Sequence, residues 1–500
     1  TPSSCGPRPP KENSWASSAA FESTALVVDP ANGSLSGIAA DVFRHAGCGE
    51  VIEVNNLGDV NLDSGVGDLE GHKIITSSMI NKKSGAFRKH KAVLKMFELG
   101  RKRKQKILAG KSRISGAVFD ADGDRFYRLD YHPRRDALLV LSGDETAFMQ
   151  AQYLMARNPD RYQGAAYINT VESDLNAGLA AKSLGLGLHL AAVGDKWISL
   201  RIAALIAEAR LKILENNKVR AALLIKRELN TLLRVGILDV HQLQKIEEAI
   251  DKLQEQNTIA PLAVGSEETG HNITLGWLDT EEGARFPVFF GNGLKSALNT
   301  FAATSYLTRN KSVQACYAYL EEPFKPGFKQ TYYVYYVAKE LFRANSAVWK
   351  QAKKRLFDEG KKQGYLCELT DFREDPDMLY VTLTPRPGAK TKPGAIFVRN
   401  SGTENKIGVN LRGDRQDAQK LKSIGERVVR FLFSTLKDKK NRLYQLELEL
   451  LRKIETKKKH ETSDDAEPRV LHEMKKQDLI RLTPNGFRLS PEGKWYISQN

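Results

Sequence analysis

The sequence has few cysteines and no long apolar stretch. Its four cysteines are scattered over 500 residues, with neither the spacing of a metal site nor the pattern of a disulfide framework. Such sparse cysteine suits a reducing compartment, so we expect the protein in the cytoplasm. No run approaches the roughly 18 apolar residues of a membrane-spanning helix, and residues 1–13 lack the apolar core of a secretory signal. We therefore expect no membrane partner.

The sequence is long and carries more positive than negative charge. Five hundred residues exceed what one hydrophobic core holds, which predicts several domains. Lysine and arginine number 76 against 60 aspartates and glutamates, a net charge of +16 that favours anionic partners such as phosphorylated metabolites or nucleic acid. Residues 82–113 hold thirteen of these bases and one acid, Glu98. We interpret that segment as either a solvated helix and loop or a nucleic-acid-binding surface.

Short apolar runs separated by helical periods predict an α/β fold. Residues 1–23, rich in serine, proline and glycine, predict a flexible leader. A strand at residues 25–29, a helix at 38–46 and a strand at 51–54 follow in the βαβ order of a parallel or mixed sheet. The pattern predicts further elements: strands at 116–119, 138–141, 165–170, 379–383 and 396–398, and helices at 174–184, 348–359 and 418–436.

Two segments differ from this alternation. Residues 199–258 carry apolar side chains at helical spacing with many charges between them, which predicts a helical insertion for packing or oligomer formation. Residues 441–500 begin as a Lys/Glu-rich linker. They end with an apolar helix and a predicted hairpin whose turn is Pro484-Asn485-Gly486. This tail resembles the second half of a winged helix.

Three aspartates lie in a glycine-containing loop after a predicted strand: Asp120, Asp122 and Asp124. Their spacing presents several carboxylate oxygens to one point, as in sites for a hard cation such as Mg²⁺. An EF-hand is excluded because its twelfth position, a glutamate, is Tyr131 here. Arg125 would hold a substrate or phosphoryl oxygen. The same acids could also form a purely structural turn.

Other polar loops follow predicted strands. Residues 399–406, Arg-Asn-Ser-Gly-Thr-Glu-Asn-Lys, combine hydroxyls, close backbone N–H groups and positive charge, which suits a phosphate, although the same residues could form only a turn. Glu267, Thr269 and His271 share a short glycine loop and can bind sugar hydroxyls. Gly194-Asp195-Lys196 follows another apolar run.

The order of these four motifs closely resembles the α-D-phosphohexomutase superfamily, which includes phosphoglucomutases and phosphomannomutases. The motifs are Asp-x-Asp-Gly-Asp-Arg, Gly-Asp-Lys, Glu-x-Thr-Gly-His and Arg-x-Ser-Gly-Thr-Glu-x-Lys. The strand at 26–29 with Asn32-Gly33 is similar to the opening of that family's second domain. The resemblance covers about residues 24–435, apart from the insertion and the basic segment.

The resemblance implies a role for each motif. Asp120, Asp122 and Asp124 would bind Mg²⁺; Arg125 and Lys196 would be further catalytic residues; Glu267, Thr269 and His271 would contact the sugar; Arg399, Ser401, Gly402 and Thr403 would hold the phosphate. It implies a second family domain at 24–137, a third at 138–330 and a smaller α+β fourth at 331–440, before the linker and extension at 441–500.

The resemblance also implies the reaction. A phosphoserine would donate its phosphoryl group to a hexose phosphate, such as glucose or mannose phosphate, and the resulting bisphosphate would return its other phosphate to the serine. Hexose 1,6-bisphosphate would be both activator and intermediate. The family's first domain, with its Thr-x-Ser-His-Asn-Pro nucleophile loop, is not found in the sequence. We therefore identify no nucleophilic serine.

We expect the missing domain to act in cis or in trans, and the chain alone to bind Mg²⁺ and hexose phosphate with little turnover. The alternative hypothesis is a catalytically inactive sugar-phosphate-binding or nucleic-acid-binding protein built on a mutase scaffold. The sequence does not choose among glucose, mannose and amino sugars.

Overall fold

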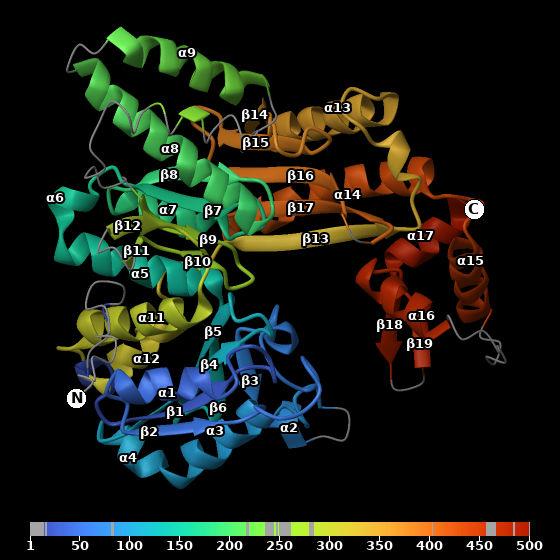
Figure 1. The fold of residues 1–500 in the computed structure, drawn as a ribbon. Coiled ribbons are helices and arrows are strands. Elements are labelled where there is room, and N and C mark those ends of the chain that lie inside the picture. The colour runs from blue at the N-terminus through green and yellow to red at the C-terminus, as the bar shows by residue number, and fades with distance from the viewer. Residues whose placement is uncertain are drawn as a thin grey trace, which may run out of the picture. The chain divides into compact units, whose positions relative to one another are not determined.

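The computed structural model describes residues 15, 18–81, 85–216, 220–235, 245–246, 249, 262–279, 285–402, 404–456, 467–483 and 486–499. The chain divides into two compact units, Thr1–Lys325 and Pro326–Asn500, each built of helices and sheets (Figure 1). The multidomain α/β fold class expected from the sequence is confirmed. None of the helices in these ranges has the length and apolar content that a bilayer crossing requires.

Unit 1 begins with a mixed six-stranded sheet of order β2-β1-β4-β5-β6-β3. Its strands are β1 (Thr24–Asp29), β2 (Glu50–Glu53), β3 (Ile74–Thr76), β4 (Arg113–Phe119), β5 (Phe126–His132) and β6 (Ala137–Leu141). The β1 strand runs parallel to β2 and β4, and the other pairs are antiparallel. Because β6 pairs with β5 and β3, the first sheet extends to Leu141, four residues beyond the domain boundary expected after residue 137.

Helices cover both faces of this sheet. They include η1 (Ser18–Phe21), α1 (Ile38–His45), η2 (Gly67–Leu69), α2 (Ser78–Asn81), α3 (Lys91–Lys102) and α4 (Lys104–Leu108). Alternate residues of β1 point to opposite sides, so Val27 packs in a core with α3 and Val28 in a core with α1. Phe21 is buried in the second core. Residues 18–21, at the end of the segment expected as a flexible leader, thus form a short helix that contributes Phe21 to this core.

The basic segment forms α3, α4 and the turns around them. Among its described bases, three make ion pairs within the fold: Arg101 with Asp136, Arg103 with Glu50 and Lys95 with Glu98. Part of the charge is thus neutralised by neighbouring carboxylates. Lys82 and Lys83 lie outside the described residues.

A second sheet in unit 1 has the order β10-β9-β7-β8. Its strands are β7 (Ala166–Thr170), β8 (Gly187–Ala191), β9 (Leu262–Ser266) and β10 (Asn272–Ile273), and β11 (Gly276–Asp279) pairs separately with β12 (Arg285–Val288). The flanking helices are α5 (Gly143–Arg157), α6 (Pro159–Tyr162), α7 (Leu175–Ser183), α8 (Asp195–Asn216) and α9 (Arg220–Val235). The central strand β7 is parallel to β8 and β9, so their carboxyl ends lie at one edge.

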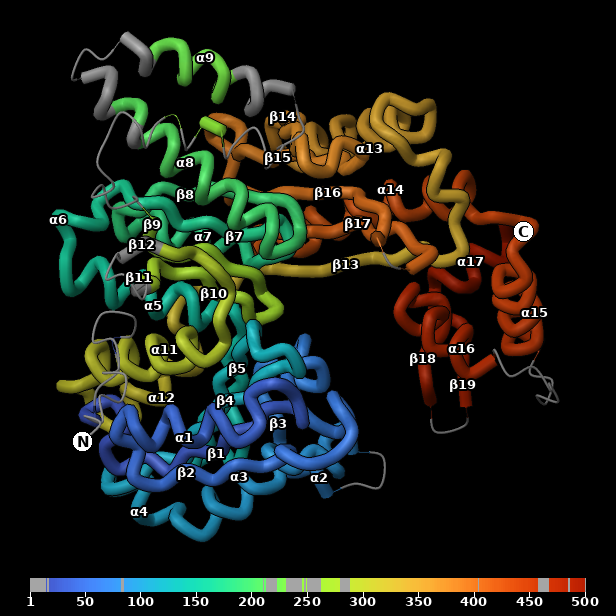
Figure 2. The backbone as a smooth tube through the Cα atoms, viewed as in Figure 1, coloured from blue at the N-terminus to red at the C-terminus, as the bar shows by residue number. Residues whose placement is uncertain are grey.

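The predicted helical insertion begins earlier than expected. Helix α8 starts at Asp195 rather than near residue 199, so Asp195 and Lys196 lie in its first turn. Helix α9 lies alongside α8 (Figure 2), and Leu211 and Leu229 share a small apolar core. The remaining insertion residues are outside the described part, apart from 245, 246 and 249.

Two helices return to the first sheet after the second one is complete. They are α11 (Gly293–Thr308) and α12 (Val313–Glu321). Phe301 packs in the core that contains Val28, and Leu320 packs in the core that contains Val27. Residues 293–321, expected in the region of the third family domain, thus complete the core of the first sheet.

Unit 2 contains an antiparallel five-stranded sheet of order β13-β17-β16-β15-β14. The strands are β13 (Phe328–Tyr335), β14 (Tyr365–Thr370), β15 (Leu379–Pro385), β16 (Gly394–Asn400) and β17 (Lys406–Gly413), with η3 (Lys339–Leu341), α13 (Ala347–Lys362), η4 (Arg415–Asp417) and α14 (Ala418–Leu436). Leu356 of α13 and Leu432 of α14 share one core with the sheet residue Val409.

The C-terminal tail packs into the same core. It consists of α15 (Arg442–Glu455), α16 (Glu467–Lys476), β18 (Ile480–Thr483), β19 (Gly486–Leu489) and α17 (Pro491–Gln499). The predicted hairpin is confirmed by the pairing of β18 with β19, while Pro484 and Asn485 of its turn lie outside the described residues. Leu450, Met474 and Tyr496 are buried with the sheet residues, so the tail is part of unit 2.

Candidate functional site

Three of the four sequence motifs come together in unit 1. Residues 120–125 connect β4 to β5, residues 192–194 connect β8 to α8, and residues 267–271 connect β9 to β10. The first and third loops are joined by backbone pairing: the Phe126 N–H donates to the Gly270 carbonyl at 3.2 Å, and Arg125 forms an isolated antiparallel bridge with His271. The two sheets therefore present their strand-end loops to each other.

The aspartate loop forms an acidic cluster. One carboxylate oxygen from each of Asp120, Asp122 and Asp124 lies within 4.8 Å of the others. Burial, together with the carboxylates of Asp124 and Asp122, raises the pKa of Asp120 to about 6, although the Arg125 N–H donates to Asp120 Oδ1 at 3.0 Å. Carboxylates held this close repel one another, and a divalent cation would offset that repulsion. The residues thus fit Mg²⁺.

Arg125 lies beside this cluster. Its Nε atom is 3.3 Å from Asp120 Oδ2, and its Nη1 atom is 3.9 Å from Glu70 Oε1. The side chain is 38% exposed, so the guanidinium can turn toward a ligand without leaving a buried cavity behind. Glu70 was not identified from the sequence, because it lies in an irregular segment far from every motif.

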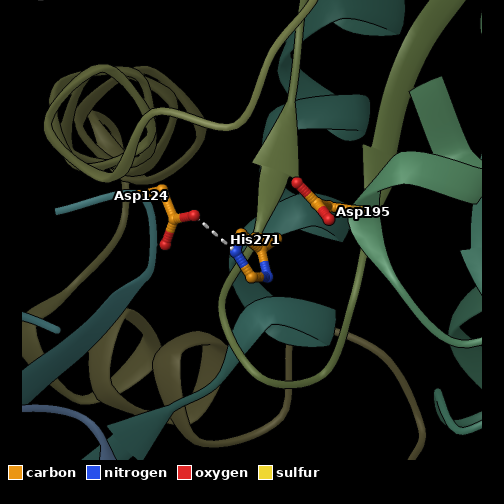
Figure 3. A group of neighbouring side chains, drawn as sticks. All are labelled: Asp124, Asp195 and His271. Atoms are coloured by element: carbon orange, nitrogen blue, oxygen red, sulfur yellow. Dashed lines mark ion pairs between the residues drawn. The ribbon is translucent and has the colours of Figure 1, made fainter. Parts of the chain in front are cut away.

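A chain of hydrogen bonds connects the other two loops to the aspartate loop. The Gly194 N–H donates to Glu267 Oε1 at 2.8 Å. Glu267 Oε2 lies 2.9 Å from His271 Nδ1, and His271 Nε2 lies 2.9 Å from Asp124 Oδ2 (Figure 3). Each contact holds the next side chain in place, so the imidazole is fixed between two carboxylates.

The electrostatics of this chain follow from its contacts. Burial lowers the pKa of His271, but hydrogen bonds to Glu267 and Asp124 outweigh burial and raise it to about 9. Burial raises the pKa of Glu267, but the His271 contact and the Gly194 N–H leave it below its usual value. At neutral pH the imidazole is therefore a cation between the Glu267 and Asp124 side chains.

Two other predicted residues lie at the margin of this group. The Thr269 hydroxyl donates weakly to Glu267 Oε2 at 3.4 Å. Lys196 is exposed in the first turn of α8, where its ammonium lies 4.8 Å from the centre of the Trp197 ring. Among the described residues of unit 1, Lys196 has no hydrogen bond or ion pair with the aspartate loop.

The fourth motif forms the β16–β17 connection in unit 2. The Ser401 N–H donates to the Lys406 carbonyl at 3.0 Å, and the Glu404 N–H donates to the Ser401 hydroxyl at 3.2 Å. Gly402 is exposed, and a Cβ atom there would meet nothing within 4 Å. Thr403 lies outside the described residues. The backbone at Gly402 is thus open to a ligand.

Charged side chains surround this loop. Arg399 Nε lies 2.8 Å from Asp375 Oδ2, and Lys406 forms an ion pair with Glu404. The ammonium of Lys339 donates to the Ser401 carbonyl. No sequence motif points to Lys339, because it belongs to η3, far from the phosphate motif in the sequence. The tertiary fold adds this third cation to Arg399 and Lys406.

Sequence relatives give the site a family context. A phosphoglucosamine mutase of Caldicellulosiruptor bescii is 28% identical over 180 residues, 36% of this chain and 32% of the relative. One from Marinomonas sp. is 30% identical over 177 residues, 35% of this chain and 31% of the relative. One from Tropheryma whipplei is 24% identical over 173 residues, 35% of this chain and 30% of the relative. These matches confirm the resemblance to the α-D-phosphohexomutases.

The chain spans about a third of the length of the curated phosphohexomutases it matches. No protein-family model matches the sequence. A phosphoglucomutase/phosphomannomutase family protein from Burkholderia thailandensis aligns with a TM-score of 0.43 at 15% identity, over 83% of this chain and 62% of that chain. An N-acetylglucosamine-phosphate mutase in a substrate complex aligns with a TM-score of 0.44 at 12% identity, over 82% of this chain and 61% of that chain.

Gly143, the first residue of α5, packs closely against the backbone of the loop that contains Glu267 and His271. A Cβ atom on Gly143 would lie 1.8 Å from the Glu267 carbonyl oxygen, so the backbones must separate in Gly143→Ala. We expect this variant to lose about 1–3 kcal/mol of unfolding free energy, measured by urea titration with circular dichroism. Gly67→Ala is the control, since a Cβ atom there would meet nothing within 4 Å. Equal stability of both variants would contradict the close packing.

Proposed function

We propose that this protein acts as a phosphohexomutase, transferring a phosphoryl group within a hexose phosphate through a hexose 1,6-bisphosphate. The observation that carries the proposal is the hydrogen-bond chain from Gly194 through Glu267 and His271 to Asp124. It joins the sugar-binding and cation-binding motifs of one family at a single place in unit 1. The curated relatives are phosphoglucosamine mutases, which supports an amino-sugar phosphate as substrate.

The residues of unit 1 suit the requirements of this reaction. Asp120, Asp122 and Asp124 would hold Mg²⁺, which neutralises charge on a transferring phosphoryl group. Glu267 and His271 present charged hydrogen-bonding groups to sugar hydroxyls and hold one another in position. Arg125, only partly buried, supplies a bidentate donor for a phosphoryl oxygen.

The residues of unit 2 suit a phosphate group. Arg399 and Lys406 flank the loop, and Gly402 lets a ligand approach the backbone N–H groups. We assign to this loop the phosphate-binding role of the family motif.

Hexose phosphate binding tests the phosphate loop. We expect glucosamine 6-phosphate to bind saturably in isothermal titration calorimetry with Mg²⁺ present. The double variant Arg399→Ala, Ser401→Ala should bind at least about 10-fold more weakly, since a charged hydrogen bond contributes about 1.5–3 kcal/mol. Arg427→Ala, which removes an exposed arginine on α14, should bind as the unchanged protein does. Equal affinity in the double variant and the control would refute the assignment.

A mutase assay separates the enzyme from the inactive scaffold considered above. Glucosamine 6-phosphate is incubated with hexose 1,6-bisphosphate and Mg²⁺, and the 1-phosphate is measured. Conversion above a protein-free blank, abolished in Asp120→Asn, supports the mutase. Because little turnover is expected of this chain alone, the assay is repeated with a longer form that carries the family's phosphoserine domain. Binding without conversion in both forms favours the sugar-phosphate-binding alternative.

A further inference from the structure

A second group of side chains near the aspartate loop has the composition of a metal site. One ligand atom from each of Asp124, Asp195 and His271 lies within 4.8 Å of the others. The three residues come from the β4–β5 loop, the first turn of α8 and the loop between β9 and β10. Figure 3 shows the three side chains turned toward a common space. Three separate segments thus supply one imidazole and two carboxylates.

The orientation of the histidine matches that of a metal ligand. His271 Nδ1 lies 2.9 Å from Glu267 Oε2, while the opposite carboxylate oxygen of Glu267 accepts the Gly194 N–H. The side chain of His271 is 7% exposed, so its ring is fixed by its surroundings. A histidine that binds a metal typically donates its other ring N–H to a carboxylate in this way. Nε2 is thereby directed at Asp124.

Asp124 has capacity for a further partner. Its Oδ2 atom faces His271 Nε2, whereas its Oδ1 atom is buried and accepts no hydrogen bond from the described residues. A buried carboxylate oxygen without a donor is costly unless a ligand supplies the missing interaction. Asp124 also belongs to the aspartate cluster with Asp120 and Asp122, so the two groups share one carboxylate.

We propose that Asp124, Asp195 and His271 bind a divalent transition-metal ion such as Mn²⁺, next to the all-oxygen aspartate cluster with which this group shares Asp124. A mixed set of imidazole and carboxylate ligands favours Mn²⁺ or Zn²⁺ over Mg²⁺, which takes oxygen ligands. On binding, the metal–nitrogen bond replaces the Nε2–H bond, and the proton leaves to solvent. The inference goes beyond the mutase activity and does not require phosphoryl transfer.

Pulsed electron paramagnetic resonance of Mn²⁺ on the full chain tests the proposal directly. Nitrogen-14 modulation reports a histidine nitrogen bound to Mn²⁺, and the aspartate cluster contains only oxygen ligands. We expect the modulation in the unchanged protein, its loss in His271→Gln and its retention in Asp122→Asn. Glutamine keeps a hydrogen-bonding group toward Glu267, and circular dichroism verifies that each variant is folded.

A second variant keeps the test decisive if His271→Gln does not fold. Asp195→Asn removes a ligand of this group and leaves the aspartate cluster intact. It should weaken the nitrogen-coordinated Mn²⁺ by at least about 10-fold. No nitrogen modulation at saturating Mn²⁺, or modulation that persists in His271→Gln, would overturn the proposal. Neither result bears on hexose phosphate binding, so failure here is distinguishable from failure of the mutase function.

Discussion

Replacing Asp120 and Asp122 by asparagine is expected to lower the affinity of the chain for Mg²⁺ by at least about 100-fold. Changes to residues around metal ligands already cost about 10–100-fold, and this variant removes two charges from the ligand group itself. Asparagine retains the oxygen that accepts the Arg125 N–H from Asp120, so the loop should keep its backbone conformation. Isothermal titration calorimetry with MgCl₂ measures the affinity directly.

Without Mg²⁺, we expect the same double variant to be at least as stable as the unchanged protein. Burial is the main cause of the raised pKa of Asp120, and the Asp124 and Asp122 carboxylates add to the shift. Removing two of these charges relieves repulsion, so the unfolding free energy should be unchanged or higher in a chelator. Asp160→Asn, an exposed aspartate in α6, controls for the loss of charge alone. Unchanged Mg²⁺ affinity in the double variant would show that these carboxylates do not bind the ion.

Lys437→Met is expected to lower the unfolding free energy by about 3–5 kcal/mol. The Lys437 ammonium lies 2.5 Å from a carboxylate oxygen of Glu447, and these side chains are 3% and 0% exposed. Burial lowers the pKa of Lys437, with the Glu447 carboxylate acting against that shift. Removing one partner of a buried pair leaves an uncompensated charge, which is the cause of the large cost. Urea unfolding monitored by circular dichroism and tryptophan fluorescence measures it.

The surroundings of this pair show what it stabilises. Lys437 also donates to Gln477 at 3.0 Å, and Gln477 accepts the Tyr335 N–H of β13 at 3.0 Å. Four aromatic rings have their centres 5.1–5.6 Å from the Lys437 ammonium, those of Tyr336, Phe433, Tyr444 and Tyr496. The network therefore connects the five-stranded sheet to the C-terminal tail.

A double variant separates loss of charge balance from loss of packing. Lys437→Met, Glu447→Gln removes both charges and should recover part of the stability that Lys437→Met loses. Lys439→Met, at an exposed position, should change the unfolding free energy by less than about 0.5 kcal/mol. If Lys437→Met were as stable as Lys439→Met, the buried pair would not hold the tail to the sheet.

Local patterns predicted much of the secondary structure. The apolar run at residues 25–29 lies within β1, and the helix predicted at 418–436 coincides with α14. Both succeed because each element's signal is contained in its own residues, as an apolar run or a helical period. The α/β fold class followed from the same signals.

Local patterns did not predict the long-range pairing of strands and helices. Residues 138–141 have the pattern of a buried strand. That pattern does not determine whether the strand is the last to join the first sheet or the first strand of the second sheet. The structure gives β6 to the first sheet because its pairing partners are β5 and β3. Helices α11 and α12 likewise pack against a sheet formed much earlier in the chain. Only the assembled cores decide these contacts.

The sequence by itself determined the chemistry available to this protein. Carboxylates, a histidine, hydroxyls and glycines in an ordered set of loops identified a phosphohexomutase relative, because residue types and their spacing are local properties. Tertiary structure decided which of these groups meet. His271 stands between Glu267 and Asp124, and Lys339 reaches the Ser401 carbonyl, because the sheets bring distant strand ends together. Side chains far apart in the chain can share a charge or a ligand only when packing holds them within a few ångströms.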